Sequence, residues 1–211
     1  GAGLTASTFE RMSWGLAFLD ADLDADLDLY FANGHLFPQV DEHPELKESY
    51  AQRDQVFANE GGRFRDVSAT AGRGLTVQKP SRAVAVGDLD DDGDPDLVVS
   101  AMDEEPALLE NTQQSGNHWL GIEVRQTGSN PFAIGARVDV ECLGGRKQLR
   151  EVRSGGGYLS QNDLRALFGL GGQAGPATVE VRLGGRRWRW VGVAVDRHVR
   201  LVLDEEHRVQ P

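Results

Sequence analysis

This sequence of 211 residues has a single cysteine, no long apolar run and no excess of basic residues. The single cysteine, Cys142, excludes an intrachain disulfide and leaves the redox compartment open. No apolar stretch approaches the roughly 18 residues that a membrane-spanning helix needs, so we expect no membrane span. With 22 basic and 33 acidic residues the net charge is −11, which argues against nucleic acid or an anionic membrane as a partner. Residues 1–11 lack the charged-then-apolar pattern of a signal peptide, which leaves a mature, a cytosolic and a truncated chain all open.

Glycine, in contrast, is abundant. Its 26 residues lie well above the usual share of about 7% and indicate many tight turns, which favours short strands over helices. Hydrophobic residues make up 39% of the chain, enough for a core in one large or two small domains. Cys142 ends the alternating stretch 137–142 with no thiolate-stabilising motif beside it, so we expect a buried small side chain there and not a reactive thiol.

The acidic excess is concentrated in two short segments, residues 20–28 (loop 1) and 88–96 (loop 2). Loop 1 holds five aspartates and loop 2 six, and without these eleven the acidic residues equal the 22 basic ones in number. The two loops belong to an internal repeat with an offset of 68 residues. Matching apolar segments precede each loop, follow it and recur further on, at 13–19, 29–31 and 57–59 in the first unit and at 81–87, 97–99 and 109–111 in the second. Each unit therefore predicts a strand, an acidic loop and further strands.

The longer connection in the first unit, residues 33–53, is rich in charge and contains Pro38 and Pro44, so we expect a surface loop with a helical turn. From residue 119 onward the pattern changes to separate alternating strands with Gly-rich turns between several of them, at 120–125, 137–143, 148–153, 178–183 and 187–203 with a break near Asp196. Charge changes at the same place, because residues 1–112 carry 23 acidic and 8 basic residues and the rest carry 10 and 14. We place a domain boundary between residues 113 and 114.

Both loops place aspartates at positions 1, 3, 5, 7 and 9, namely Asp20, Asp22, Asp24, Asp26 and Asp28 in loop 1 and Asp88, Asp90, Asp92, Asp94 and Asp96 in loop 2. Odd-position groups of a tightly wound loop can converge on one point, and Ca²⁺ takes six to eight oxygen ligands. We expect side-chain oxygens from positions 1, 3, 5 and 9 and a backbone carbonyl from position 7. The sequence therefore predicts two Ca²⁺ sites.

Two other interpretations of the loops are less satisfactory. An EF-hand needs a bidentate Glu at position 12, where this chain has Phe31 and Val99, and it needs flanking helices. A merely solvated acidic face would not need the same spacing twice, and carboxylates about 5 Å apart repel by roughly 3 kcal/mol at an effective dielectric near 20. Mg²⁺ demands a smaller octahedral shell. Position 6 is Gly93 in loop 2 but Ala25 in loop 1, so a positive φ there would strain loop 1 by about 1 kcal/mol.

The segment 88–97, Asp-Leu-Asp-Asp-Asp-Gly-Asp-Pro-Asp-Leu, resembles the calcium loop of FG-GAP/VCBS repeats, which form the blades of integrin-type β-propellers. Motifs further on resemble the ASPIC/UnbV domain in order and spacing, at 117–120, 128–130, 133–138, 157–161 and 168–171. FG-GAP repeats followed by ASPIC/UnbV are the arrangement of the cartilage acidic protein family and its bacterial homologues. One departure is 182–185, Arg-Leu-Gly-Gly, where family members often carry Trp-Pro-x-Gly.

The resemblance implies an all-β protein: a partial β-propeller of about two calcium-stabilised blades in residues 1–113, followed by a small sandwich or barrel-like ASPIC/UnbV domain in 114–211. It also implies a secreted, extracellular or cell-envelope location and no established catalytic activity. A propeller usually needs four to eight blades, so we expect the others from preceding residues of a longer protein or from another chain. Open blade edges would otherwise invite pairing with neighbours.

We therefore expect a calcium-binding, non-enzymatic adhesion or structural protein whose partner is a protein or carbohydrate ligand at the cell surface. The five histidines show no His-x-x-x-His pair, which argues against a transition-metal site. Carboxylates that hold a cation cannot also serve as a catalytic acid of raised pKa. Trp188 and Trp190 alternate with arginines, which predicts tryptophans facing a core and leaves a binding face as the alternative. Two other functions stay open, a binding module of a carbohydrate-active enzyme and a subunit of an extracellular polymeric assembly.

Overall fold

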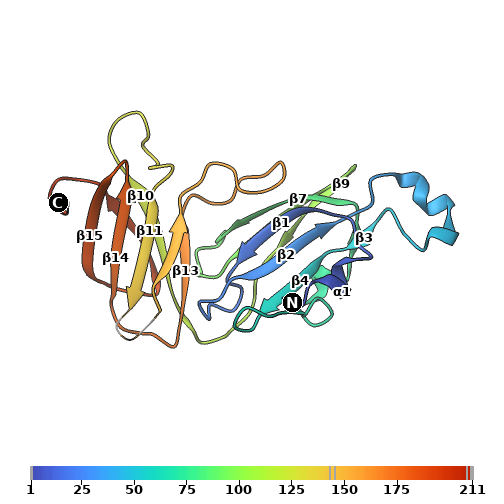
Figure 1. Cartoon of the computed structure of the whole chain (residues 1–211), viewed down its shortest axis with the longest axis horizontal. Coiled ribbons are helices and arrows are strands. Elements are labelled where there is room, and N and C mark those ends of the chain that lie inside the picture. The colour runs from blue at the N-terminus through green and yellow to red at the C-terminus, as the bar shows by residue number, and fades with distance from the viewer. Residues whose placement is uncertain (1, 143, 145, 208, 210–211) are drawn as a thin grey trace.

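The computed structural model describes residues 2–142, 144, 146–207 and 209. They form an elongated all-β molecule, as predicted, with one group of sheets at each end of its long axis (Figure 1). We call residues 2–117 the N-terminal region and residues 118–209 the C-terminal region. The predicted boundary at 113/114 falls in the connection between the last strand of the first region and the first strand of the second. Among the described residues no helix is long and apolar enough to cross a membrane.

The N-terminal region contains two antiparallel sheets that follow the predicted repeat. The first has the strand order β1 (Ser13–Leu19), β2 (Asp28–Asn33), β4 (Gln55–Asn59) and β5 (Phe64–Asp66). The second has the order β7 (Ser81–Gly87), β8 (Asp96–Ala101) and β9 (Glu104–Leu109). The sheets pack face to face through alternate apolar side chains, among them Ala17, Leu19 and Tyr30 of one and Val84, Leu97 and Val99 of the other. Both sheets are open, and the number of propeller blades stays a prediction.

Shorter elements complete this region. A two-stranded ladder joins β3 (Gln52–Arg53) to β6 (Gln78–Lys79), and a short helix, α1 (Thr5–Thr8), precedes β1. The predicted helical turn in the long connection is confirmed as two 3₁₀ helices, η1 (Pro38–Glu42) and η2 (Pro44–Leu46), each beginning at a proline, a residue suited to the first helical position. A third, η3 (Arg73–Thr76), buries Leu75 against the shared core of the two sheets.

The C-terminal region is a sandwich of two sheets around one apolar core. One sheet has the order β13 (Ala166–Gly171), β10 (His118–Arg125) and β16 (Arg197–Val202), and β10 pairs with β16 in parallel. The other has the order β12 (Gln148–Glu151), β11 (Arg137–Cys142), β14 (Ala177–Leu183) and β15 (Arg186–Val193). Strand β13 was not predicted, because its alternate glycines, Gly169 and Gly171, indicate a turn in the sequence.

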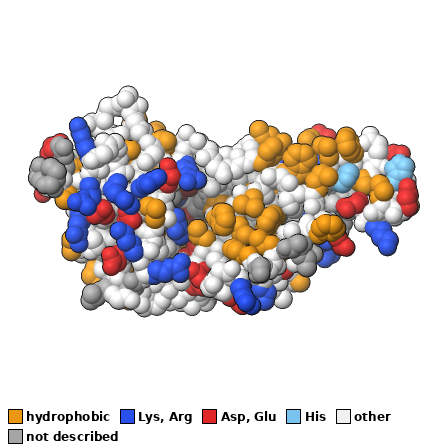
Figure 2. All heavy atoms as spheres, viewed as in Figure 1, with side chains coloured by type: hydrophobic (Ala, Val, Ile, Leu, Met, Phe, Trp, Pro, Cys, Tyr) orange, Lys and Arg blue, Asp and Glu red, His pale blue; other side chains and the backbone are white. Residues whose placement is uncertain are grey.

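Two predictions about this core are confirmed. Cys142 is buried, and burial raises the pKa of its thiol. Trp188 is only 4% exposed and Trp190 packs against the same core, while Arg187 and Arg189 are exposed on the other face of β15. Figure 2 shows the outcome for this face of the molecule: basic side chains gather over the C-terminal region, and apolar ones gather over the N-terminal region.

Candidate metal centres

Loops 1 and 2 each close a hairpin between antiparallel strands. The last strand pairs are Leu19 with Asp28 and Gly87 with Asp96, so the ladder brings position 9 back beside position 1 in both loops. The position 9 carboxylate then accepts a hydrogen bond from the backbone N–H of position 2. The donor is Ala21 in loop 1 and Leu89 in loop 2, and both distances are 2.9 Å.

The rest of the hydrogen-bond pattern is also the same in the two loops. The position 1 carboxylate accepts the N–H of position 6 at 3.0 Å, from Ala25 to Asp20 and from Gly93 to Asp88. Carboxylates at positions 3 and 5 accept N–H groups two residues further on. Hydrogen bonds to its own aspartates therefore fix the winding of each loop.

Position 6 requires a left-handed backbone in both loops. Its φ is +78° at Ala25 and +102° at Gly93. This is the condition under which we expected loop 1 to be strained, since an L side chain is disfavoured there by about 1 kcal/mol.

Two residues outside the loops, which the aspartate spacing does not identify, bond the carboxylates at position 9. The backbone N–H groups of Asn59 and Asn111 donate to the second oxygens of Asp28 and Asp96, each at 2.8 Å. The side chain of Asn59 also bonds the Leu27 carbonyl of loop 1. Both asparagines lie in the matching segments 57–59 and 109–111. The repeat therefore pairs the two residues in the sequence, where we interpreted the segments only as strand ends.

Three of the predicted carboxylates in each loop converge as a cation site requires. Oxygens of Asp20, Asp22 and Asp24 lie within 4.8 Å of one another, and so do oxygens of Asp88, Asp90 and Asp96. One oxygen each of Asp20, Asp88 and Asp94 is buried and has no hydrogen-bond partner. An uncompensated buried carboxylate oxygen is costly, and a cation would remove that cost. These donors are all hard oxygens, the ligands of Ca²⁺, so the residues present fit this ion.

The pKa values reflect the same crowding in the metal-free chain. Burial, aided by neighbouring carboxylates, raises the pKa of Asp20 to about 7 and that of Asp94 to about 7. Burial also raises the pKa of Asp28 to about 6, in spite of two backbone hydrogen bonds that lower it. Without a cation these groups therefore keep their protons to a higher pH than an ordinary aspartate does.

The loops differ at position 7, where we predicted carbonyl ligands. Asp26 of loop 1 turns its carboxylate to Arg146 at 2.6 Å, which leaves its carbonyl for the site. Asp94 of loop 2 is 7% exposed and lies near four other aspartates, so its side chain is a further potential ligand. Asp91, at the even position 4 of loop 2, turns away from the loop and pairs with Arg165, in agreement with the expected alternation.

The C-terminal region packs directly on both loops. His198 Nε2 lies 2.8 Å from Asp88, and Arg165 also bonds the Asp88 carbonyl. In loop 1, the Leu23 carbonyl accepts a hydrogen bond from the N–H of Gly171 at 2.8 Å. The side chain of Asn117, the residue just before β10, donates to the Asp22 carbonyl at 2.8 Å. Neither contact surface tolerates a larger residue: a Cβ on Gly93 would lie 1.9 Å from the Trp119 ring, and one on Gly169 would lie 2.3 Å from an Asp20 oxygen.

Two histidines join acidic groups that the sequence spacing did not reveal. His198 lies with Asp88 and Asp91, and His207 lies with Asp204 and Glu206. In both groups the imidazole makes a short contact with a carboxylate, 2.8 Å from Asp88 and 2.9 Å from Asp204. Both histidines are therefore partners of carboxylates in short polar contacts.

Comparisons with known proteins confirm the resemblance seen in the sequence. Residues 126–208 match the model of the ASPIC and UnbV family, and residues 41–99, which include loop 2, match that of the FG-GAP-like repeat. Cartilage acidic protein 1 of Xenopus tropicalis is 29% identical over 157 residues, and the proteins of the same name from Homo sapiens and Mus musculus are 29% identical over 156 residues. Each alignment covers 72% of this chain and 22% of the relative, so the chain spans about a fifth of the length of the curated relatives it matches.

Proposed function

We propose that this chain, which carries FG-GAP-like and ASPIC/UnbV sequences, is a calcium-dependent, non-enzymatic interaction module of an extracellular or cell-envelope protein. The observation that carries the proposal is the same loop built twice, each time with a buried position 1 oxygen, on Asp20 and on Asp88, that lacks a partner. The similarity to cartilage acidic protein 1 supports a location outside the cell, where calcium is abundant.

Ten aspartates would hold the two ions. Carboxylates at positions 1, 3, 5 and 9 contribute in both loops, with the position 7 carbonyl of Asp26 in loop 1 and Asp94 in loop 2. Bound calcium would supply positive charge to clusters that otherwise repel themselves. The chain's own residues position the carboxylates. Position 6 fixes the turn, and Asn59 and Asn111 anchor position 9.

The loops also give calcium a role in joining the two regions. His198, Arg165, Gly169 and Gly171 of the C-terminal region contact the loops. Ordering the loops therefore orders a surface that the C-terminal region contacts. We propose that the ligand-binding unit is the assembled pair of regions, with a protein or carbohydrate at the cell surface as its partner.

Calorimetric titration of the metal-free protein with CaCl₂ tests this proposal. We expect two calcium ions per chain. Asp22→Asn with Asp24→Asn should remove the ion of loop 1 only, and Asp90→Asn with Asp92→Asn should remove that of loop 2 only. Asp103→Asn, an exposed change outside both loops, is the control. Wild-type protein that takes up no calcium would refute the proposal.

A further inference from the structure

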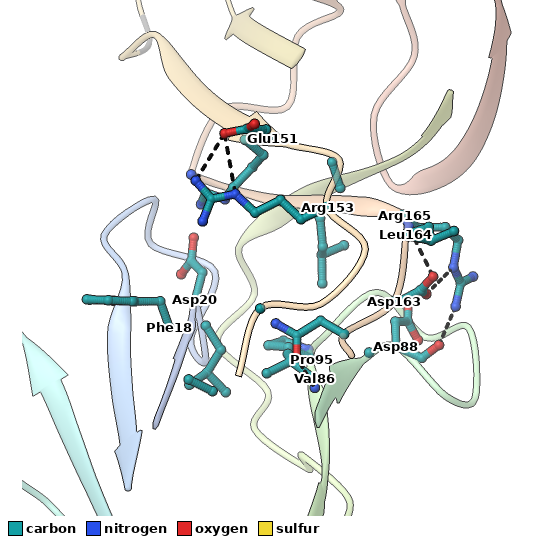
Figure 3. Close-up of a pocket in the computed structure, with 18 of the residues that line it drawn as sticks. Phe18, Asp20, Val86, Asp88, Pro95, Glu151, Arg153, Asp163, Leu164 and Arg165 are labelled. Atoms are coloured by element: carbon teal, nitrogen blue, oxygen red, sulfur yellow. Dashed lines mark hydrogen bonds and ion pairs between the residues drawn. The ribbon is translucent and has the colours of Figure 1, made fainter. Parts of the chain in front are cut away.

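A cavity of about 400 Å³ lies between the two regions, next to both loop sites. Its walls come from β1 and β7 on one side and from residues 150–167 on the other. In Figure 3, Phe18 and Asp20 lie on one side of this space and Arg153 and Glu151 on another. Because the position 1 aspartates Asp20 and Asp88 both line it, the cavity adjoins both loops.

The N-terminal wall is apolar and exposed. Leu16 is 39% exposed and Phe18 is 55% exposed, both on the face of β1 turned away from the core that the two sheets share. An aromatic and an aliphatic side chain at the mouth of a cavity suit an apolar group of a ligand.

The opposite wall carries the guanidinium of Arg150, which forms no close ion pair with a described residue. Arg150 donates to the Leu149 carbonyl at 3.2 Å and to the Gln148 side chain at 3.3 Å, and its guanidinium lies 5.2 Å from the centre of the Phe168 ring. The described residues place no carboxylate within ion-pair distance of it, whereas Arg153 is paired with Glu151 and Arg165 with Asp163. A partly buried, uncompensated guanidinium favours an anion, above all a planar one such as a carboxylate.

Calcium would strengthen this preference. In the metal-free chain Arg150 interacts electrostatically with Asp20. A calcium ion held by Asp20 would neutralise that aspartate, and one held by Asp88 would neutralise the second aspartate that lines the cavity. The remaining unpaired charge in the cavity would then be positive.

We propose that this cavity binds a carboxylate that carries a neighbouring apolar group, with Arg150 holding the carboxylate and Phe18 and Leu16 holding the apolar group, when calcium occupies the loops. The calcium dependence rests on the proposed function. A carboxylate next to an apolar side chain occurs at the C-terminus of a peptide and in small aryl or alkyl acids.

The probe is a fluorescently labelled peptide, Gly-Gly-Ser-Phe with a free C-terminal carboxylate, and its C-terminal amide is the matched control. Anisotropy is measured with calcium and with a chelator, and unlabelled 3-phenylpropanoate is the competitor. We expect the peptide acid to bind only with calcium and the amide to bind about tenfold more weakly. The variants Arg150→Gln and Phe18→Ser should each lose a similar factor in affinity for the acid. Arg189→Gln and Leu108→Ser, both exposed and outside the cavity, should bind as wild type does.

The outcomes distinguish a small acid from a peptide C-terminus as the ligand, and they distinguish failure of this inference from failure of the proposed function. If 3-phenylpropanoate displaces the probe at a concentration similar to that of the unlabelled peptide acid, a small acid is a sufficient ligand. If only peptides displace it, the ligand is the C-terminus of a peptide. Equal binding of acid and amide, binding unaffected by Phe18→Ser, or binding only of an oligogalacturonate would overturn this inference. A change of oligomeric state in Phe18→Ser without any peptide binding would also overturn it. Calcium uptake without binding of either acid refutes this inference alone, whereas absence of calcium uptake refutes the proposed function.

Discussion

At the scale of single residues, the two loops differ most informatively at position 6. Both backbones are left-handed there, but only Gly93 adopts that conformation without cost, while Ala25 is strained. Gly93 also has a second reason to be glycine, because the Trp119 ring occupies the place of its Cβ. The same position thus has one constraint in loop 1 and two in loop 2.

Exchanging the residues at this position should have opposite effects in the two loops. We expect Ala25→Gly to stabilise calcium-loaded protein by up to about 1 kcal/mol and to raise the calcium affinity of loop 1. Gly93→Ala should destabilise it by more than about 1 kcal/mol, since backbone strain and overlap with Trp119 add. Urea unfolding of each variant in excess calcium measures both effects, with Gly61→Ala as control for positive φ in open space. Equal and small effects of all three changes would contradict this account.

At the scale of elements, alternation predicted most strands and the repeat predicted both acidic hairpins. Strand β13 was missed because Gly169 and Gly171 interrupt the apolar pattern, and these glycines are there for close approach to Leu23 and Asp20 of loop 1. The loop aspartates were found because their spacing is local. Asn59, Asn111 and His198 were not found as partners of the loops, because their contacts join residues 15 to 110 positions apart in the chain.

The hairpin loops should make the stability of calcium-free protein depend on pH. The pKa values of Asp20, Asp28 and Asp94 are about 7, 6 and 7, against an ordinary 3.8, so the folded state holds more protons than the unfolded state between about pH 4 and 7. Stability therefore falls as pH rises through this window and levels off above it. Calcium competes with these protons, so the stabilisation that calcium confers should grow from pH 5 to pH 8.

Differential scanning fluorimetry across that pH range, with calcium and with a chelator, measures this difference. Asp54 is half-buried and lies outside both loops, and its raised pKa lowers stability with rising pH in both forms. Only the difference between the two curves is therefore diagnostic. A calcium effect that is the same at pH 5 and pH 8 would contradict the assignment of these carboxylates.

At the scale of the whole molecule, an acidic N-terminal region and a basic C-terminal region meet at the loops. Ion pairs cross the junction, from Arg146 to Asp26 and from Arg165 to Asp91, together with the contact of His198 with Asp88. The −11 net charge of the chain is thus concentrated where the cations are proposed and where the C-terminal region docks.

Removal of calcium should loosen the junction before it unfolds either core. We expect hydrogen exchange to accelerate in both loops and in β13, while β11 and β14 in the centre of the second sheet stay protected. Gly169→Ala should reproduce the loosening in the presence of calcium, because its Cβ would overlap loop 1. Gly172→Ala, where a Cβ meets nothing within 4 Å, is the matched control. Uniform exchange throughout the chain after chelation would contradict a calcium-ordered junction.

The most direct test of the central claim, that calcium stabilises this chain through the two loops, is the thermal unfolding midpoint as a function of free calcium. Binding to the folded state alone stabilises by mass action, by about 2.7 kcal/mol per site when free calcium is 100 times Kd. The account predicts a midpoint that rises steadily with calcium and not with equal magnesium, and a smaller rise when either loop carries its paired Asp→Asn changes. A midpoint that is the same in calcium and in chelator would contradict it.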